Sequence, residues 1–549
     1  MNRPIDVIIV GGGWSGMLAC KHMIEGGLNP LVIEKRKSFG GVWRFSNDPE
    51  VATVMKTTET TSSRSATEMS DFPMKDEYGQ FPKHDQILEY LKDYGDKFNI
   101  WQYFRYGQHV KKIQKTEDCW QVETNQATYQ SKYLIVASGV HQTPNLEHMN
   151  EVFEKFSGSL QHAIQIKEIG ESYRDQNILV YGGGETASDM VELLDNIAGR
   201  LVMSIPNGQH FFQKRKRPIS PFLDWLVPGN YGEPLDKANS LMIGLVSPAS
   251  KSKPGMAWAC RKYTTNSVFG YQGHGIPQWK NRSEFFHAFI NKNAAPVDLV
   301  RSGRLVAKGS IRQVEGKCIT FDDGETLEFD RVIACTGYRP NLEFLDQETQ
   351  KNTQCLYKYI FNPYDPTMAF VGLIRPIILS IPGLAELQAK AIMKVWSNQC
   401  QLPEKEKMIS IAVDEKQIWN EYFKDTSNRI QNLMQPFKYI GDLHQTFAFS
   451  PGGKALFKRS PKLFFYVLTS PYHACFSLLN NSIYDHHVIR TLKRQTNLGW
   501  QIVPFGLAIA RLLQVDRISN LIGDFRYKRQ LKKMVWHKKK GAPPLLKTE

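Results

Sequence analysis

The sequence predicts an α/β fold with two parallel-sheet domains and a helical C-terminal extension. Two glycine-rich turns support this prediction: residues 11–16 have the pattern GxGxxG, and residues 182–187 have GxGxxA. Each turn follows a short apolar strand, at residues 7–10 and 178–181, and opens a helix-like stretch. A strand, a glycine-rich turn and a helix in this order are typical of Rossmann-like dinucleotide-binding domains. Two such units suggest that two dinucleotides are held at once, so that hydride can pass between them.

The residue types within each turn suit the close approach of a pyrophosphate. The first glycine permits a tight turn, the second lets the backbone approach the phosphates, and the third position must be small so that the helix packs on the strand. The pyrophosphate then lies on unpaired N–H groups at the positive end of the helix dipole. A turn without a ligand is the alternative for either one alone. The expected cofactor contacts are Gly11, Gly13, Trp14, Ser15 and Gly16 in the first turn, and Gly182, Gly184, Glu185, Thr186 and Ala187 in the second.

The residues beyond the two turns predict different nucleotides. Glu34 follows the apolar residues 31–33, where a carboxylate accepts hydrogen bonds from a ribose 2′-OH and repels a 2′-phosphate, as suits the adenosine of FAD. No acid stands at the equivalent place after the second turn, where we expect Ser204. Lys214 and Arg215 begin a basic run shortly beyond, and together with Ser204 they suit the 2′-phosphate of NADPH. A solvated loop is the alternative interpretation of this run.

The composition is that of an ordinary globular protein with a basic excess. The 549 residues are 42% hydrophobic and 22% charged, with a net charge of +15, and can form two or more domains. Part of the excess lies in a tail at residues 526–540, which is either a solvated end, as we favour, or a peripheral contact with an anionic membrane surface. No nucleic-acid-binding module is recognisable. The apolar stretch at residues 502–510 is too short to span a bilayer.

Cysteine usage predicts the compartment. The eight cysteines are scattered without a CxxC pair, which indicates a reducing cytoplasmic location and no structural metal site. The chain enters a strand at once, so we expect no signal peptide. The positive charge would also attract an anionic substrate.

A repeated strand ending predicts how the chain is divided. Small residues that include Ala137 and Gly139 follow one buried strand, and a similar segment that ends in Gly337 follows another. Such segments let backbone pass close to a cofactor, so these three residues are candidate contacts. Two unrelated buried strands are the alternative. We expect an FAD-binding domain in two parts (residues 1–150 and 331–445), an inserted NADPH-binding domain (151–330) and a helical extension with a basic tail (446–549).

Within the insertion, residues 207–285 lack a clear periodicity and are rich in aromatic residues and prolines. A long stretch of this kind in a compact domain is usually functional or has its own irregular structure. The aromatic residues therefore form either the walls of a site for a flat organic substrate or a small core of the loop itself.

Several motifs together resemble the flavin-containing monooxygenases. The residues after the first turn, through Glu34 and Lys35 to Gly41, Val42 and Trp43, are similar to the start of that family. The resemblance implies that NADPH reduces FAD, that the reduced flavin reacts with O2 at C4a to give a hydroperoxide shielded by retained NADP+, and that the distal oxygen reaches a substrate. The protein then supplies position, dryness and hydrogen bonds. Further similar segments are residues 69–73, 156–162, 386–389, 460–463 and 470–472, with Asp189 after the second turn.

The chain also departs from the family pattern. The final aromatic of the family fingerprint FxGxxxHxxx(Y/F) is Ile166, and the second turn has Glu185 and Thr186 where the family usually has Asn-Ser. Thr61 stands where ordinary members have an asparagine that contacts flavin and NADP+. Threonine is shorter and donates only one proton, so the pocket is altered unless water fills the gap after neutral drift.

The altered segment resembles single-component halogenases of the same family from marine bacteria. In those enzymes bromide attacks the distal oxygen, and the hypobromous species acts on 4-hydroxybenzoate, with decarboxylation, and on phenols. The chain is similar in length, in the lost asparagine and in lacking a membrane anchor. The candidate catalytic residues are then Thr61, Ser63, Arg64 and Lys56, with Lys56 or Arg64 holding the hypohalous species.

Our first interpretation is therefore halogenation of a phenol with O2, NADPH and bromide. Ordinary oxygenation of a nitrogen, sulfur or ketone substrate is the alternative. A disulfide or quinone reductase is disfavoured because Cys20 stands alone in the first helix. A flavin-binding protein without activity also stays open. The sequence gives neither the substrate, the halide preference nor the oligomeric state, for which a homodimer is one option.

Overall fold

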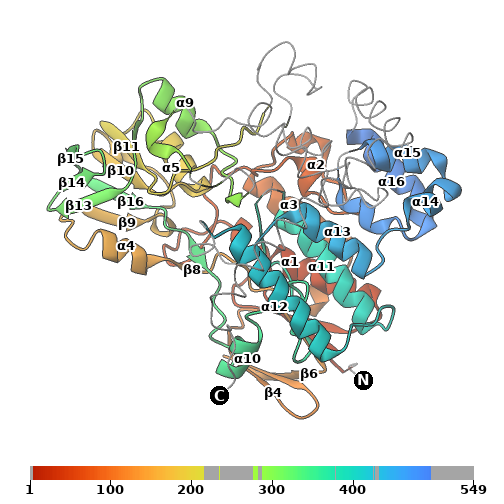
Figure 1. Ribbon diagram of the computed structural model, residues 1–549. Helices are drawn as coiled ribbons and strands as arrows, with labels where there is room; N and C mark the ends of the chain where they lie inside the picture. Colours follow the sequence, from red (N-terminus) through yellow and green to blue (C-terminus); the bar gives the residue numbers. More distant parts are fainter. Residues whose placement is uncertain are drawn as a thin grey trace, which may run out of the picture.

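The computed structural model describes residues 4–215, 234, 276–281, 283, 287–377, 379–424, 426, 432–470 and 472–495. Figure 1 shows a lobe that contains β9 to β16, a central lobe that contains α1, α3 and α11, and a group of helices, α14 to α16, at the opposite side. Most of the segment 207–285, the apolar stretch 502–510 and the basic tail 526–540 lie outside the described residues. The α/β fold class with two parallel sheets, predicted from the sequence, is confirmed.

The first sheet has the strand order β18-β7-β1-β2-β3, and every neighbouring pair is parallel. β1 and β2 are buried along their whole length, so both are continuous apolar runs up to Glu34 rather than alternating patterns. The strands are β1 (Val7–Val10), β2 (Pro30–Glu34), β3 (Phe104–Tyr106), β7 (Tyr133–Val136) and β18 (Met368–Phe370).

The second sheet has the order β12-β11-β10-β16-β9 and is also parallel throughout. Its central strand β10 lies between β11 and β16, as β1 lies between β2 and β7 in the first sheet. The strands are β9 (Ser159–His162), β10 (Asn177–Tyr181), β11 (Arg200–Ser204), β12 (Val306–Lys308) and β16 (Arg331–Ala334).

Each parallel sheet is accompanied by a small antiparallel sheet of three strands. In both cases the chain forms this small sheet and then adds a strand next to the one that precedes the glycine-rich turn. These added strands are β7, which pairs with β1, and β16, which pairs with β10. The two sheet units are therefore built on one plan. The small sheets consist of β4 (Val110–Lys115), β5 (Trp120–Thr124) and β6 (Thr128–Ser131), and of β13 (Ile311–Glu315), β14 (Cys318–Phe321) and β15 (Thr326–Glu328).

The chain passes between the two units through β8 (Thr143–Pro144) and β17 (Tyr338–Arg339), which pair antiparallel. β16 pairs with β9 and β10, so residues 331–334 belong to the second sheet, although the sequence analysis assigns them to the returning part of the FAD-binding domain. The passage back follows β16, and β18 then completes the first sheet.

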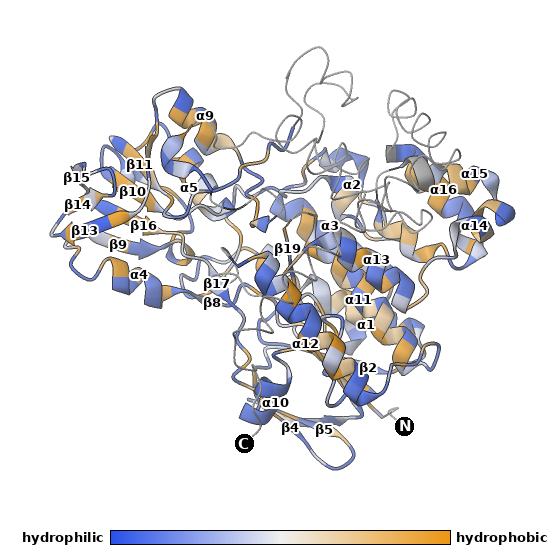
Figure 2. Cartoon of the chain, viewed as in Figure 1, coloured by the Kyte–Doolittle hydropathy of each residue, from blue (hydrophilic) through white to orange (hydrophobic). Residues whose placement is uncertain are grey.

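Helices cover both sheets, and their apolar faces point inward. α1 and α11 pack along each other, and Figure 2 shows both as largely hydrophobic, whereas α4 at the surface has a mixture of hydrophobic and hydrophilic residues. Among the described residues no helix is both long and apolar enough to cross a membrane. The helices of the domains are α1 (Trp14–Glu25), α2 (Arg64–Thr67), α3 (His84–Lys97), α4 (Leu146–Val152), α5 (Glu185–Leu194), α9 (Ala295–Arg301), α10 (Gln347–Asn352), α11 (Ile381–Trp396), α12 (Lys405–Tyr422) and α13 (Pro436–Thr446).

Residues 453–495 form a C-terminal unit with a core of its own. It contains α14 (Gly453–Arg459), α15 (Pro461–Thr469) and α16 (Asp485–Gln495). Its buried core includes Leu456, Leu463, Val467, Phe476 and Leu492. The helical extension expected from the sequence therefore has helical structure over its described part.

Candidate cofactor and substrate site

The first glycine-rich turn leaves no room for side chains at two of its glycines. Gly11 has φ +110°, and a Cβ there would lie 2.6 Å from the carbonyl oxygen of Ala137 at the end of β7. A Cβ on Gly16 would overlap the carbonyl oxygen of Gly11. The turn therefore holds β1, α1 and the end of β7 in direct backbone contact, as a tight dinucleotide turn requires.

The second turn repeats this geometry. Gly182 has φ +131°, and a Cβ there would lie 2.6 Å from the carbonyl oxygen of Cys335 at the end of β16. Ala187 takes the place of Gly16, and its methyl group is fully buried. Ala137 and Cys335 thus occupy equivalent positions, which explains the repeated strand ending seen in the sequence.

Three glycines at the ends of the strands and at a helix N-terminus face open space. No atom lies within 4 Å of a Cβ built on Gly184, Gly139 or Gly337. Gly13 differs, because a Cβ built there would lie in contact with the Cα of Gly41 at 3.4 Å. Gly139 in the first domain and Gly184 and Gly337 in the second mark cradles that the surrounding protein does not fill, and such cradles fit a pyrophosphate or a nearby part of a dinucleotide.

Polar groups around the first cradle also fit a bound FAD. The indole nitrogen of Trp14 and the hydroxyl of Ser138 are buried and have no hydrogen-bond partner among the described residues. Trp14 packs against Trp43, with ring centroids 6.3 Å apart. Gly41, Val42 and Trp43 form a short 3-10 helix beside the turn, and the hydroxyl of Ser15 lies against Gly372.

Glu34 lies where the sequence predicts a ribose-binding carboxylate. Its side chain is buried and accepts hydrogen bonds from the N–H of Gly12 at 2.6 Å and from that of Arg36 at 2.7 Å. The Arg36 guanidinium donates to the carbonyl oxygens of Gly41 and Arg44. The carboxylate is therefore fixed at the end of β2, whereas the neighbouring Lys35 is exposed.

The strand register shows that Ile205, not Ser204, is the counterpart of Glu34. Val10 pairs with Ile33 and Tyr181 pairs with Ser204, so Ser204 occupies the buried position of Ile33. Its hydroxyl is fully buried and donates to the carbonyl oxygen of Gly309 at 2.6 Å. The hydroxyl of Ser204 is therefore engaged within the protein, and the residue at the position of Glu34 is apolar.

Lys214 and Arg215 contact the first domain instead of the loop after β11. The Lys214 ammonium pairs with Glu59 at 2.8 Å, and the Arg215 guanidinium donates to Gln80 at 2.5 Å. Lys216 and Arg217, the remainder of the basic run, lie outside the described residues. The structure thus separates these cations from Ser204, with which the sequence analysis groups them.

Thr61 lines a small hollow between the two domains, which we call the Thr61 hollow. Two lysines, two phenylalanines and two hydroxyl residues are among those that line it. Lys292, which no sequence motif indicates, is 3.9 Å from Glu185, a turn residue expected to contact the cofactor. Thr186 beside it is exposed. The lining residues are Thr61, Ser62, Phe81, Phe212, Lys214, Lys292 and Leu379.

The other candidate catalytic residues do not line the Thr61 hollow. Lys56 is more than half exposed and pairs with Glu168 of the second domain at 3.2 Å. Arg64 pairs with Asp76 at 2.7 Å, and Ser63 is buried. Both Ser63 and Arg64 line a second hollow, together with Arg494 of the C-terminal unit. Sequence proximity to Thr61 therefore does not place these side chains beside it.

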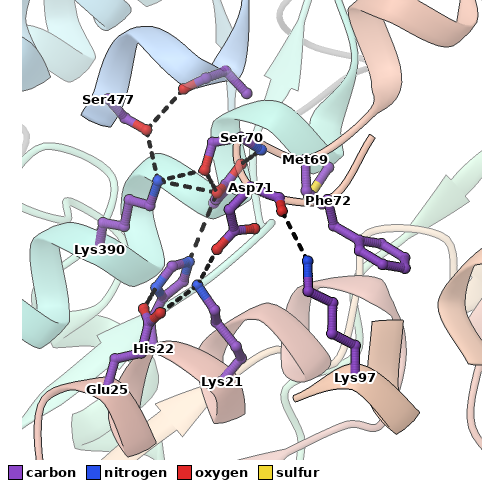
Figure 3. Close-up of polar contacts among 12 residues, drawn as sticks. Lys21, His22, Glu25, Met69, Ser70, Asp71, Phe72, Lys97, Lys390 and Ser477 are labelled. Atoms are coloured by element: carbon purple, nitrogen blue, oxygen red, sulfur yellow. Dashed lines mark hydrogen bonds and ion pairs between the residues drawn. The ribbon is translucent and has the colours of Figure 1, made fainter. Parts of the chain in front are cut away.

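A buried polar cluster fixes the segment around Ser70, which follows Thr61 in the sequence. Figure 3 shows Ser70 between α11 and the C-terminal unit. Glu386 accepts from the N–H of Ser70 at 3.0 Å and also from its hydroxyl. Lys390 donates to Ser70 at 2.7 Å and to Ser477 at 2.6 Å. Three segments far apart in the sequence are thus joined at one buried point.

Charges in this cluster are paired, as burial demands. Lys21 binds Asp71 at 2.5 Å and Glu25 at 2.7 Å, and Glu25 also accepts from His22. Burial favours the neutral acid, but His22 and Lys21 outweigh it and lower the pKa of Glu25 to about 2. Burial lowers the pKa of His22, so this imidazole is neutral. Removal of one partner would leave an uncompensated buried charge.

Two half-buried basic residues, Arg375 and His141, also have no signal in the sequence. Burial lowers the pKa of Arg375 to about 10, against the opposing charge of Glu185. Burial and the charge of Arg375 lower the pKa of His141 to about 3, so this imidazole is neutral. Both residues become recognisable only once the two domains are placed together.

Asp189 gives a pH-dependent prediction. Its carboxyl accepts from Asn293 at 2.9 Å, and burial raises its pKa from 3.8 to about 6. The native state then binds the proton more tightly than the unfolded chain, so stability falls as pH rises from about 4 to about 6 and stays lower above. We expect Asp189→Asn to raise the free energy of unfolding at about pH 8 by about 2 kcal/mol.

Urea unfolding of both proteins at the two ends of this pH range measures the effect. Near pH 4, roughly the ordinary carboxyl pKa, the two should differ little, because both side chains are then neutral. An equal difference between the proteins at both pH values would contradict a raised pKa at Asp189.

Comparison with known proteins agrees with a site for two dinucleotides. The chain matches the model of the flavin-binding monooxygenase-like family over residues 5–480. It is 27% identical to mouse dimethylaniline monooxygenase (N-oxide-forming) 2 over 479 residues, covering 83% of this chain and 85% of that protein. Human flavin-containing monooxygenase 5 is 26% identical over 487 residues, covering 85% and 87%.

Solved structures share the fold at lower identity. S-allyl-L-cysteine S-oxygenase from Allium sativum has a TM-score of 0.57 and 18% identity, covering 90% of this chain and 98% of that one. NADP+-bound cyclohexanone monooxygenase from Rhodococcus sp. Phi1 has a TM-score of 0.54 and 15% identity, covering 81% and 97%.

The fold and the two glycine-rich turns define a class of enzymes that hold two dinucleotides together. This chain belongs to the flavin-binding monooxygenase-like family, as the sequence motifs predict. It is a flavin-dependent monooxygenase-type oxidoreductase, and its cofactors are FAD and NADPH.

Proposed function

We propose that this enzyme acts on a small anionic aromatic substrate and that, with bromide, it halogenates a phenol such as 4-hydroxybenzoate. One observation supports the proposal: Lys214 and Lys292 are among the residues that line the Thr61 hollow, and no acidic residue is among them, although each lysine has a carboxylate partner, Glu59 and Glu185. A halide, a phenolate or a carboxylate is attracted to such a lining, and a protonated amine is repelled.

The residues of the Thr61 hollow have separate roles in this proposal. The positive charges of Lys214 and Lys292 attract the anion, with Lys292 less tightly paired than Lys214, and Phe81 and Phe212 supply apolar rings for an aromatic substrate. The hydroxyl of Thr61 donates one hydrogen bond at the place of reaction. Bound FAD, once reduced by NADPH, supplies the activation of O2.

The overall reaction balances with the reactants named. NADPH gives two electrons, and bromide together with the arene gives two more as the carbon–bromine bond forms. O2 accepts all four electrons and becomes two waters. A ring proton or, for an aryl carboxylate, carbon dioxide leaves the carbon that is brominated.

The test is product analysis with the FAD-loaded enzyme. We expect NADPH, air and 4-hydroxybenzoate to give brominated phenols by mass spectrometry when bromide is present and none without it. NADPH oxidation with no brominated product at any bromide concentration would overturn halogenation. The cytoplasmic location expected from the sequence belongs to the same proposal and is tested by cell fractionation.

Ordinary oxygenation is the second candidate, and the names of the relatives favour it. Mouse dimethylaniline monooxygenase forms an N-oxide, and the Allium sativum enzyme is an S-oxygenase. If bromide has no effect, neutral sulfides and ketones are expected to be better substrates than amines, because the lysines of the Thr61 hollow disfavour cations.

Thr61→Val tests the role of the hydroxyl. Valine has nearly the same shape and lacks the donor, so FAD content should not change. We expect product formed per NADPH consumed to fall roughly five- to tenfold, about the value of one hydrogen bond. The control is Thr57→Val on the same segment, since Thr57 is exposed. An unchanged product yield in Thr61→Val would exclude a direct role for this side chain.

A further inference from the structure

The loop after β11 is where the second domain must distinguish NADPH from NADH. In the first domain the equivalent position holds Glu34, whose carboxylate lies beside Gly12. In the second domain Ile205 lies beside Gly183, because a Cβ on Gly183 would be 2.8 Å from its Cγ2 atom. An apolar residue does not repel a 2′-phosphate, but it does not bind one either. A cation is therefore needed from elsewhere.

Two of the nearby cations are already engaged. Lys308, at the end of β12, is buried and pairs with Asp323 at 2.5 Å and with Glu325. Lys214 lies against Glu59 at the Thr61 hollow. A buried or paired ammonium of this kind cannot approach the phosphate without losing its partner.

Among the described residues Lys280 is a further cation of this region, and the backbone holds it against the loop. Gly208 has φ +66°, and a Cβ there would lie 2.5 Å from the carbonyl carbon of Lys280. The N–H of Gln209 donates to the carbonyl oxygen of Trp279 at 3.0 Å. The indole N–H of Trp279 in turn donates to the backbone carbonyl oxygen of Lys308 at 3.1 Å. The main chain at Lys280 is thus fixed beside the loop, while the residue itself is exposed.

We propose that Lys280 is the specificity-determining residue that binds the 2′-phosphate of NADPH. Its flexible side chain carries the ammonium from this fixed backbone position to the mouth of the loop after β11, where Ile205 leaves the 2′ position open. The assignment deepens the known NADPH dependence and does not rest on the identity of the oxidised substrate.

Nucleotide binding to the oxidised, FAD-loaded enzyme tests the proposal without turnover. Dissociation constants are measured by calorimetry for NADP+, NAD+ and the fragment 2′,5′-ADP. We expect Lys280→Ala to weaken NADP+ and 2′,5′-ADP roughly tenfold, as for one lost charge-assisted contact, and to leave NAD+ unchanged. Lys280→Arg should retain most of the preference.

The double variant Lys214→Ala, Arg215→Ala is the matched comparison. We expect its ratio of NADP+ to NAD+ affinity to stay near that of the wild type. A normal ratio in Lys280→Ala, or a loss confined to the double variant, would overturn the proposal. Because no substrate or halide is present, failure of the proposed halogenation would not affect either result.

Discussion

Gly16→Ala is expected to abolish FAD binding by disrupting the first domain. The added methyl group would overlap the carbonyl oxygen of Gly11 and lie 3.0 Å from its carbonyl carbon. Both are backbone atoms of a turn that also contacts Ala137, so α1 must move away from β1. We expect a cost of about 3 kcal/mol, at the upper end of overpacking penalties.

Flavin absorbance of the purified protein and its thermal unfolding measure this effect. The matched control is Ala187→Gly at the equivalent place of the second turn, where the existing methyl group fits and is buried. That change should cost about 1 kcal/mol, the ordinary penalty for glycine in a helix, and should leave FAD bound. Normal flavin content in Gly16→Ala would show that the helix can shift without loss of the site.

This contrast between Gly16 and Ala187 indicates what a single sequence can predict. The order of strand, glycine turn and helix is local, and each glycine is required by contacts within its own turn. The fold class and the two cofactors were therefore predictable. The role of Glu34 at the ribose stays a prediction, as do the domain boundaries drawn from the repeated strand endings.

Register and long-range contacts were not predictable in this way. Ser204 and Ile205 are neighbours in the sequence, and only the pairing of Tyr181 with Ser204 shows which of them faces the turn. A shift of one residue along a strand reverses the direction of the side chain. The counterpart of Glu34 was therefore predicted one residue too early, at Ser204 instead of Ile205.

The cations show the second limit. A basic run predicts charge but not the partner, and Lys214 is drawn to Glu59, 155 residues away. Lys292 and Lys280 belong to no motif, and their positions depend on how the chain returns to the second sheet. The sequence alone therefore identifies the nucleotides more reliably than the side chains that distinguish them.

Gly184→Ala is expected to remove NADPH binding while the protein keeps its fold and its FAD. No atom lies within 4 Å of the added methyl group, and φ at Gly184 is an ordinary −83°. The methyl group would instead occupy the cradle that fits the pyrophosphate. We expect NADP+ affinity to fall tenfold or more, about 1.4 kcal/mol, with no loss of thermal stability.

Titration of the oxidised holoenzyme with NADP+, followed by flavin absorbance, measures the affinity. Gly170→Ala is the matched control, because it lies in the same domain, has an ordinary φ of −113° and likewise has no atom within 4 Å of the added methyl group. Both variants remove one glycine at a place without steric conflict, so they should share the same small change in stability. Equal NADP+ affinity in the two would show that the second turn does not hold the pyrophosphate, whereas loss in Gly184→Ala alone separates cofactor binding from folding at this turn.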